Sequence, residues 1–440
     1  MLNFDALLPI LVYGTALAVV FAGYAYRRRR RAERARQTLL QSTESGYTEP
    51  ITLHPVVNPN RCLGSGACVA ACPTGDVLAV IGGQASLINP THCIGHGRCQ
   101  EACPTEAITL AIGSETRGVD IPVLGPGFET NVPGVFVAGE LGGMGLIRNA
   151  IEQGRKAIES IPKLDRAGEG EVLDVLIVGA GPAGLGASLA AMDRGLRFAT
   201  LEQDTLGGSI VHHPRGQLVV TDSVDIPRVG TVNFGETSKE SLLEFWERVR
   251  RDTGLVIHER ERVEAIEPLE TGFLVRSARR QYETGSVILA VGRRGTPRRL
   301  DVSGEEESTQ VVYRLVDAAQ HAGKRVLVVG GGDSALESAV SVSEQPGTNV
   351  VLSYRGGIFQ RPRPATRQKL EQAAARGDVE IVLNSTVAEI ERDSVTLETP
   401  TGRRRLECDV VIVCAGGVLP NDFLRSVGVE IETKFGTPLA

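Results

Sequence analysis

The 440-residue sequence lacks a strong excess of charge of either sign, and it has little cysteine outside one short stretch. Its formal net charge is -6, so the overall charge gives no indication of a nucleic-acid partner. A disulfide scaffold would need a short secreted chain, and this length excludes that class. No residue has the setting of a general acid or base for an organic substrate. Fifty-one glycines in an otherwise apolar chain favour repeated nucleotide-binding turns over disorder.

The N-terminus differs in kind from the rest of the chain. Ala6 to Tyr26 carries no charge and is rich in Leu, Val and Ala, and an arginine run, Arg27 to Arg31, follows at once. About twenty apolar residues can span a membrane, and positive charge after the apolar run argues against a cleaved signal. We therefore predict a membrane anchor over residues 1–36, in the inner membrane with the body of the protein in the cytoplasm. Residues 37–52 are polar and unpatterned, and we expect a linker there.

Six of the eight cysteines lie in two similar segments, CLGSGACVAACP at 62–73 and CIGHGRCQEACP at 93–104. Crowded cysteines in a long chain are typical of metal ligands. The repeat resembles that of the bacterial two-cluster ferredoxins, C-x2-C-x2-C-x3-C-P. Ser65 and His96 stand where that family has its second cysteine. Between the segments, alternating apolar residues around Gly82–Gly83 predict a β-hairpin.

The ferredoxin resemblance implies a small α+β iron–sulfur domain over residues 53–114. In that family the last cysteine of each motif binds the other cluster. The ligands would then form two sets: Cys62, Cys68 and Cys103, and Cys93, Cys99 and Cys72. Three thiolates for each cluster leave three alternatives. Each cluster could lack one iron, or a fourth iron could be bound by a His96 nitrogen or, less favourably, by the Ser65 hydroxyl. The module could also have lost its clusters.

A first glycine loop lies in DVLIVGAGPAGLGASLA, where an apolar strand pattern leads into a turn and then a helical pattern. Gly179, Gly181 and Gly184 have the spacing of a dinucleotide-binding turn, which lets a pyrophosphate approach the backbone and the helix N-terminus. The next strand ends at Glu202, which we expect to accept hydrogen bonds from an adenosine ribose.

A second loop lies in RVLVVGGGDSALESA, with Gly330, Gly332 and Ala335 in the same spacing. The strand that follows ends in Ser-Tyr-Arg and has no acid. Arg355 can bind a 2′-phosphate there, so the sequence favours NADPH over NADH. Arg361 is a candidate to assist.

Two nested loops of this kind resemble the two-dinucleotide flavoproteins, in particular the thioredoxin reductase-like branch. LGGSIVHHP, with Gly207 and Gly208, is similar to the loop that leads under the isoalloxazine in that family. The resemblance implies an α/β fold with two Rossmann-like domains, the first for FAD over 166–300 and the second for NAD(P) over 301–418. Residues 419–440 would return to the FAD domain.

The chain departs from that branch in its cysteines, because the redox-active Cys-x-x-Cys ahead of the second loop is missing. Cys408 and Cys414 are no substitute. They lie too far apart, in a buried-strand pattern where cysteine behaves as a small apolar residue.

It departs also in the order of its segments. The family ends with an element that closes the FAD domain, whereas here the similar stretch TNVPGVFVAGELGGMGLIRNAIEQG precedes the FAD loop. Gly139 and Glu140 stand at its Gly-Asp position and should lie near the flavin. We predict a circular permutation in which residues 115–165 close the FAD domain, either of their own chain or of a partner in a swapped homodimer.

Together these features predict a membrane-anchored, FAD-dependent NAD(P)H oxidoreductase that passes electrons between NADPH, FAD and two iron–sulfur clusters. The outside acceptor or donor, a protein or a quinone, is unidentified. One competing hypothesis is a thioredoxin reductase-like reductase of disulfides or small molecules. The other is a non-enzymatic, membrane-tethered redox sensor.

Overall fold

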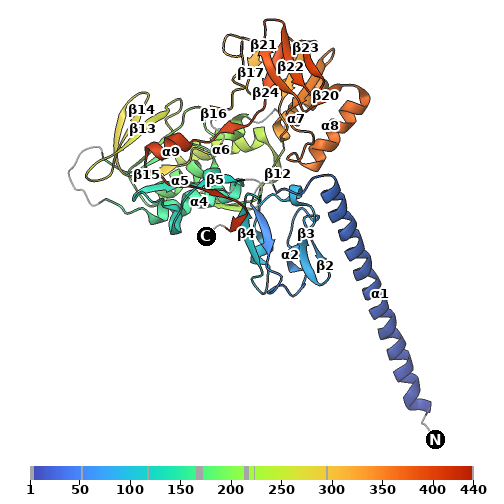
Figure 1. Ribbon diagram of the computed structural model, residues 1–440. Coiled ribbons are helices and arrows are strands. Elements are labelled where there is room, and N and C mark those ends of the chain that lie inside the picture. The colour runs from blue at the N-terminus through green and yellow to red at the C-terminus, as the bar shows by residue number, and fades with distance from the viewer. Residues whose placement is uncertain are drawn as a thin grey trace. The chain divides into compact units, whose positions relative to one another are not determined.

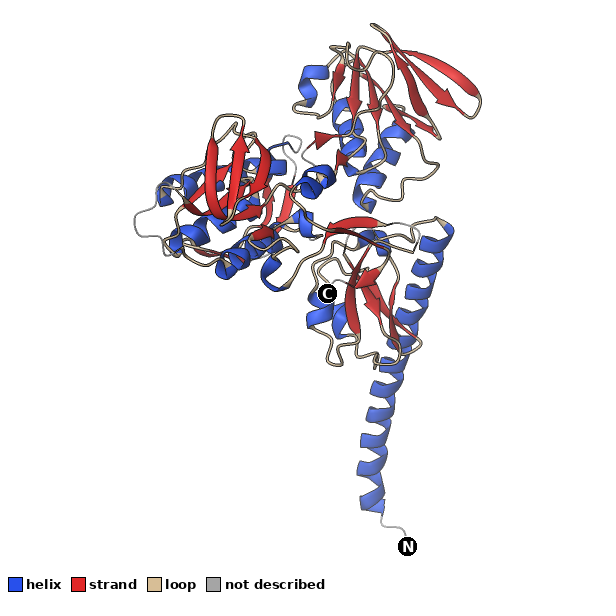
Figure 2. Cartoon of the chain, turned by 60° about the vertical axis from the view of Figure 1, so that its left-hand side comes forward, coloured by secondary structure: helices blue, strands red, loops and turns tan. Residues whose placement is uncertain are grey.

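The computed structural model describes residues 4–50, 53–115, 118–143, 145–164, 172–212, 218–221, 223–293 and 296–438. The chain forms two compact units, residues 1–111 with 437–440, and residues 112–436. Figure 1 labels their helices and strands, and Figure 2 colours them by type. The chain passes from the first unit to the second at 111–112 and back at 436–437, so two covalent connections join them.

The first unit contains a long helix and a small set of short elements. Its members are α1 (Phe4–Glu44), β1 (His54–Val57), α2 (Ala67–Ala70), β2 (Leu78–Ile81), β3 (Gln84–Leu87), η1 (Pro90–His92), α3 (Arg98–Glu101), β4 (Ile108–Ile112) and β27 (Thr437–Pro438). Strands β1, β4 and β27 form one sheet, and β2 pairs with β3. The predicted hairpin is confirmed, because Gly82 and Gly83 join β2 to β3 with φ of 61° and 86°. Positive φ at both positions is what a two-residue type I′ turn requires.

Helix α1 corrects the prediction for the N-terminus. Among the described residues, no helix is both long and apolar enough to cross a membrane. The predicted transmembrane anchor, and the inner-membrane location that rested on it, are therefore wrong.

The helix also extends into the expected linker, because α1 continues to Glu44 without a break at residue 37. Its last turns pack on the rest of the first unit. Ala35 and Ser42 are each only 6% exposed, and the Ser42 hydroxyl donates a 2.6 Å hydrogen bond to Asn89 Oδ1. Burial on the unit explains helical structure that the polar sequence alone does not predict.

The second unit begins with an α/β domain. Its elements are β5 (Val119–Pro122), η2 (Pro126–Phe128), β6 (Val135–Val137), η3 (Glu140–Gly142), α4 (Ile147–Ser160), β7 (Leu173–Val178), α5 (Pro182–Asp193), β8 (Phe198–Leu201), η4 (Gly208–His212), β9 (Leu218–Thr221), β10 (Val224–Ile226), β11 (Gly230–Val232), β12 (Gly235–Ser238), α6 (Lys239–Thr253), β13 (Val263–Pro268), β14 (Phe273–Ser277) and β15 (Gln281–Leu289). The main sheet has the order β13-β14-β15-β7-β8, with β6 also paired to β15. Strands β6, β7, β8 and β15 pair in parallel.

Helix α5 is apolar on all sides because it lies buried between the sheet and α4. The two helices approach at glycines. A Cβ on Gly154 would lie 2.0 Å from the Ala183 carbonyl oxygen, and one on Gly186 would lie 2.5 Å from that of Ile151. Thus the segment upstream of the first glycine loop supplies both a strand, β6, and a covering helix, α4, to the sheet of the same chain.

The rest of the second unit contains β16 (Thr296–Pro297), β17 (Val311–Val312), η5 (Ala318–His321), β18 (Arg325–Val329), α7 (Asp333–Ser343), β19 (Asn349–Tyr354), α8 (Pro364–Arg376), β20 (Val379–Leu383), β21 (Thr386–Ile390), β22 (Ser394–Thr399), β23 (Gly402–Glu407), β24 (Val410–Val413), β25 (Gly417–Val418), α9 (Asn421–Ser426) and β26 (Ile431–Lys434). A parallel sheet runs β17-β24-β18-β19-β20. Helices α7 and α8 contribute to the core on this sheet, and the three strands β21–β23 contribute to a second core. Near the chain end, β26 pairs with β5.

Candidate functional site

The six clustered cysteines line two separate pockets of the first unit. The first, here the Ser65 pocket, is lined by Cys62, Cys68, Cys103 and Ser65, with Leu63, Gly64, Gly66, Ala85, Thr105 and Ile108. The second, the His96 pocket, is lined by Cys72, Cys93, Cys99 and His96, with Leu53, Pro55, Thr74, Val77, Leu78, Ile94, Gly95, Gly97 and Leu110. Each pocket combines two cysteines of one motif with the last cysteine of the other. This is the crossed grouping that the ferredoxin resemblance implies, although metal binding by these residues stays a prediction.

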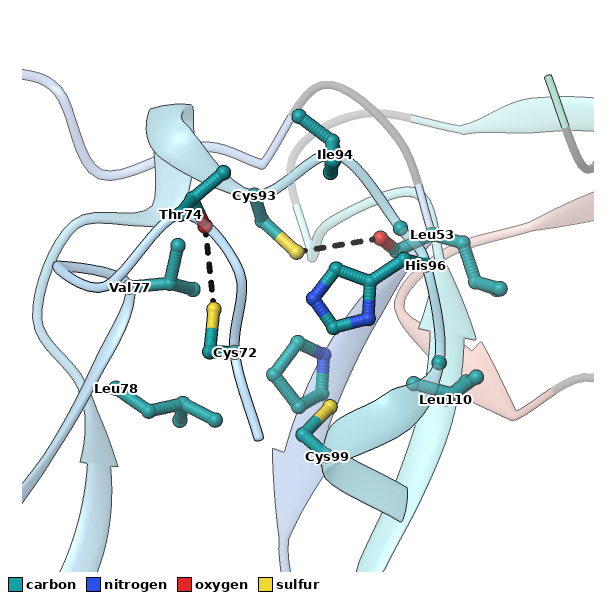
Figure 3. Close-up of a pocket in the computed structure, with 13 residues that line it drawn as sticks. Leu53, Cys72, Thr74, Val77, Leu78, Cys93, Ile94, His96, Cys99 and Leu110 are labelled. Carbon is teal, nitrogen blue, oxygen red and sulfur yellow. Dashed lines mark hydrogen bonds between the residues drawn. The ribbon is translucent and has the colours of Figure 1, made fainter. Parts of the chain in front are cut away.

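In the His96 pocket the histidine ring lies among the three thiols (Figure 3). The Arg98 backbone N–H donates to His96 Nδ1 at 2.9 Å. Burial raises the pKa of Cys72, but hydrogen bonds with the His96 side chain and with Thr74 outweigh it and bring that pKa to about 7. The Thr74 hydroxyl lies 3.1 Å from Cys72 Sγ. Burial raises the pKa of Cys93 to about 11 and that of Cys99 to about 12.

The Ser65 pocket is more polar around its sulfurs. The Ala85 N–H donates to Cys62 Sγ at 3.3 Å, and the Ala107 N–H donates to Cys103 Sγ at 3.2 Å. Burial raises the pKa of Cys103. Hydrogen bonds from backbone groups, of which that of Thr105 is the strongest, outweigh the effect of burial, so the pKa is lowered overall. The Ser65 side chain is exposed, and its Oγ accepts the Ala67 N–H at 3.4 Å.

Glycines shape both cysteine loops. Gly64 and Gly66 have φ of 64° and 77°, and Gly95 and Gly97 have φ of 73° and 83°. Residues with a side chain rarely adopt this left-handed backbone conformation. Glycine at these positions therefore lets each loop turn tightly around its pocket. At Gly64 space is limiting as well, because a Cβ there would lie 2.0 Å from the Gly83 carbonyl oxygen.

Three thiols line each pocket, which is a donor set of the kind that holds an iron–sulfur cluster. Among the described residues, no group of three or more His, Cys, Asp or Glu side chains is placed to hold one metal ion. In a cluster each thiolate binds a different iron, so the ligands surround the site and do not converge on a point. Backbone N–H groups that already point at Cys62 and Cys103 are the contacts that stabilise thiolate sulfur.

The first glycine loop joins β7 to α5. Gly179 has φ of 107°, and a Cβ there would lie 2.5 Å from the Ala290 carbonyl oxygen. A Cβ on Gly184 would lie 1.8 Å from the Gly179 carbonyl oxygen. Gly181 precedes Pro182, the first residue of α5, so the helix N-terminus opens at the loop. These close approaches explain why positions 179 and 184 are glycine, and the loop leaves a backbone cradle of the kind that binds a pyrophosphate.

Glu202 lies at the end of β8 beside this loop and is only 5% exposed. Its Oε2 accepts the Ala180 N–H at 2.7 Å, and its Oε1 accepts the Asp204 N–H at 2.9 Å. Burial raises the pKa of this carboxyl group. A carboxylate oxygen has two lone pairs, so both can still accept a ribose hydroxyl, and the predicted role of Glu202 stays open.

Gly207 and Gly208 lie against the same loop. The Gly207 N–H donates to the Ala180 carbonyl oxygen at 3.0 Å, and the Cα of Gly181 would lie 2.9 Å from a Cβ on Gly208. Their φ values are 115° and 57°. The structure thus brings these two glycines to the glycine loop, as the flavoprotein resemblance leads us to expect.

Gly139 and Glu140 follow β6, and the sequence analysis missed their partner, Gln153 on α4. Gln153 Oε1 accepts the Gly139 N–H at 2.8 Å. Its amide nitrogen Nε2 is buried without a hydrogen-bond partner among the described residues. A buried donor without a partner is costly, and a cofactor oxygen would satisfy it, so the residues here fit a flavin nucleotide. The only feature of the sequence that could have pointed to Gln153 is that a polar glutamine lies on the buried face of a helix.

The second glycine loop joins β18 to α7. A Cβ on Gly330 would lie 2.4 Å from the Cys414 carbonyl oxygen, and buried Ala335 packs beneath it. Gly332 caps α7. The ring of Tyr354 covers the loop, since a Cβ on Gly331 would lie 2.1 Å from it. Arg355 and Arg361, after β19, are exposed, and their predicted contact with a nucleotide phosphate is not tested by the structure.

All eight cysteines are free thiols. Cys408 is buried beside β24, and burial raises the pKa of both Cys408 and Cys414, the latter to about 11. A buried, protonated thiol is a poor redox group. Cys408 and Cys414 flank β24 and pack with the hydrophobic cores of this domain, as small apolar residues would.

Both parts of the chain are similar to known protein families. The family model described as pyridine nucleotide-disulphide oxidoreductase matches residues 176–439, and the model described as 4Fe-4S dicluster domain matches residues 54–104. A ferredoxin–NADP reductase from Ignicoccus hospitalis is 29% identical over 269 residues, covering 59% of this chain and 83% of the relative. One from Thermus thermophilus is 30% identical over 276 residues, covering 59% and 77%.

Solved structures show the same fold for the reductase part. The bacillithiol disulfide reductase Bdr from Staphylococcus aureus is similar with a TM-score of 0.54 at 24% identity. That from Bacillus cereus is similar with a TM-score of 0.55 at 22% identity. Each match covers 60% of this chain and 84% of the other.

Proposed function

Because the chain belongs to the pyridine nucleotide-disulphide oxidoreductase family and also carries a 4Fe-4S dicluster domain, we propose that it passes electrons between NADPH and its own iron–sulfur clusters through FAD. The observation that carries this proposal is the pair of pockets, each of which gathers three thiols from both cysteine motifs. A flavin exchanges hydride for single electrons, and iron–sulfur clusters carry single electrons. The two halves of the chain are therefore chemically matched.

The residues of the chain provide the binding sites for this chemistry. We propose that Cys62, Cys68 and Cys103 hold one cluster and that Cys72, Cys93 and Cys99 hold the other. The loop at Gly179, with Glu202, would bind FAD, and the loop at Gly330 would bind the nicotinamide nucleotide. No Cys-x-x-Cys is present to receive electrons from the flavin, which supports the clusters as the outlet.

The closing segment supports one further element of the proposal. We propose that the family's terminal FAD-closing element has been moved upstream and completes the FAD domain of its own chain. The parallel pairing of β6 with β15 and the close packing of α4 on α5 support this over a swapped dimer. The orphaned Gln153 amide then faces the nucleotide from this segment.

We propose NADPH as the nucleotide. The exposed Arg355 after β19, where an acid would favour NADH, supports this choice, as do relatives named ferredoxin–NADP reductase. The outside partner should be a one-electron carrier, such as a redox protein or a quinone, because each cluster exchanges one electron at a time.

An anaerobic reduction experiment tests the proposal. The full chain is purified without oxygen, and its flavin absorbance and EPR spectrum are recorded before and after addition of NADPH. We expect the flavin to bleach and the cluster signal to change together. The double variant Cys68→Ser, Cys99→Ser is the control and should keep the flavin response alone. Iron that stays oxidised while the flavin is reduced would overturn the proposal and leave a reductase of small molecules.

A further inference from the structure

The His96 side chain occupies the place of a missing cysteine ligand, and its ring lies among the three thiols of its pocket (Figure 3). Two roles are open to a histidine in this place. A ring nitrogen can bind iron through its lone pair, or a ring N–H can donate a hydrogen bond to sulfur. The proton position on the ring decides between them.

The backbone fixes that proton position. The Arg98 N–H donates to His96 Nδ1 at 2.9 Å, so Nδ1 must carry a lone pair and no hydrogen. In a neutral imidazole the other nitrogen, Nε2, then carries the proton. The ring lines the same pocket as Cys72, Cys93 and Cys99, so the Nε2–H is the one hydrogen it has to donate to a sulfur there.

Metal ligation would need the opposite arrangement. A histidine that binds a metal usually donates its other ring N–H to a carboxylate, a carbonyl or water. For Nε2 to bind iron, Nδ1 would have to be protonated and would face the Arg98 N–H, a contact between two donors. The imidazole could avoid this only by losing both protons or by turning away.

The other motif repeats the arrangement. Ser65 Oγ accepts the N–H of Ala67, two residues on, just as His96 accepts that of Arg98. Each acceptor precedes a glycine in the left-handed region, Gly66 or Gly97, and a short helix. In both motifs, therefore, the residue in place of the cysteine is tied to the backbone as an acceptor and keeps one hydrogen to donate.

We propose that His96 donates a hydrogen bond from Nε2–H to sulfur in its pocket and does not bind iron. Three thiolates then hold a three-iron cluster that lacks the corner at His96, and Ser65 has the same donor role in the other pocket. This inference rests on the proposed presence of clusters. Hydrogen bonds to the sulfurs stabilise the more negative, reduced cluster and so raise its reduction potential.

Pulsed EPR of the oxidised cluster tests the role of His96 directly. The Ser65→Cys variant is used because a fourth thiolate should convert the other cluster to a four-iron form, which is diamagnetic when oxidised. The remaining signal then comes from the His96 pocket. With ¹⁵N-labelled histidine we expect a weak nitrogen coupling, as from a hydrogen bond, which is lost in the added variant His96→Asn. No oxidised signal from this pocket together with a strong coupling after dithionite reduction, as expected for a four-iron cluster with a histidine ligand, or no coupling at all, would overturn the proposal.

Substitutions separate a donor from a ligand. His96→Cys should add one iron atom per chain and remove the oxidised signal of this pocket. His96→Leu should keep the three-iron signal but lower the reduction potential in a dithionite titration. His96→Asn should restore most of that potential, because its amide can accept the Arg98 N–H and still donate. A change of iron content in His96→Leu would mean that His96 is a ligand and would contradict the proposal.

These measurements use dithionite and no NADPH, so the two proposals can fail separately. Clusters that behave as described but ignore NADPH contradict the proposed function alone. A strong histidine coupling in a protein that NADPH does reduce contradicts only the role of His96. A protein without iron contradicts both.

Discussion

The Ser65 pocket and the His96 pocket come from motifs with the same cysteine spacing, and comparing them separates what the spacing does from what the neighbours do. The His96 pocket is walled by Leu53, Val77, Leu78, Ile94 and Leu110, and burial strongly raises the pKa of Cys93 and Cys99. The Ser65 pocket has smaller and more polar walls. Burial raises the pKa of its Cys68, whereas hydrogen bonds outweigh burial and lower the pKa of its Cys103, as they do for Cys72 in the His96 pocket. Equal spacing therefore places the thiols, while the chain around them sets how stable each thiolate is.

The comparison assumes that each pocket takes two cysteines from one motif and the last cysteine of the other motif. Replacing these last cysteines, Cys72 and Cys103, has the largest expected effect. Cys72→Ser should abolish the cluster of the His96 pocket, although Cys72 belongs to the first motif. Its EPR spectrum should match that of Cys99→Ser, and iron content should fall by roughly half. Cys103→Ser should match Cys68→Ser in the same way. If Cys72→Ser instead removes the same signal as Cys68→Ser, each motif binds its own cluster.

The loop glycines sharpen the comparison through backbone geometry. Gly64→Ala and Gly66→Ala both place a side chain at positive φ, but only Gly64 is blocked by the Gly83 carbonyl oxygen, whereas the nearest atom to a Cβ on Gly66 is 3.8 Å away. We expect Gly64→Ala to destabilise the hairpin by about 2 kcal/mol more than Gly66→Ala. Hydrogen exchange of the β2–β3 amides measures this as a roughly thirty-fold larger loss of protection. Equal losses would show that strain at φ alone determines the effect.

The smallest effect concerns the threonine that follows each Cys-Pro. The Thr74 hydroxyl lies 3.1 Å from Cys72 Sγ, while that of Thr105 lies 3.8 Å from Cys103 Sγ. Thr→Val removes the hydroxyl and keeps the shape. Thr74→Val should lower the reduction potential of the cluster in the His96 pocket by at most about 60 mV, equivalent to about 1.4 kcal/mol for one electron. Thr105→Val should shift the other cluster less, and redox titration of both variants would reveal any reversal of that order.

Local features were predictable because their physical cause is local. The hairpin at Gly82–Gly83 and the two strand–glycine–helix units lie within short stretches whose residues contact one another along the chain. The N-terminus was not predictable in this way. Its apolar run and arginines indicated a membrane anchor, but no described helix meets the requirements for a span, and α1 continues into the expected linker because Ser42 packs on Asn89.

Gln153 shows why part of the candidate site could not be predicted from the sequence. Nothing near it in the sequence marks it as functional, and its role follows only from the contact of its Oε1 with the Gly139 N–H across a turn between β6 and α4. The role of His96 has the same origin. Its spacing suggested an iron ligand, whereas the Arg98 N–H on its Nδ1 favours a donor.

The sequence by itself determined the chemistry available to this protein: six thiols in two equal motifs, two glycine loops that admit a dinucleotide, and no redox Cys-x-x-Cys. These depend on residue type and short spacing, which the covalent chain sets. Only the tertiary structure showed the six thiols gathered in two pockets, decided that β6 and α4 join the sheet and helix of their own chain, and placed the buried Gln153 amide. Such pairings join residues far apart in the chain, and they depend on packing that is settled only when the whole core forms.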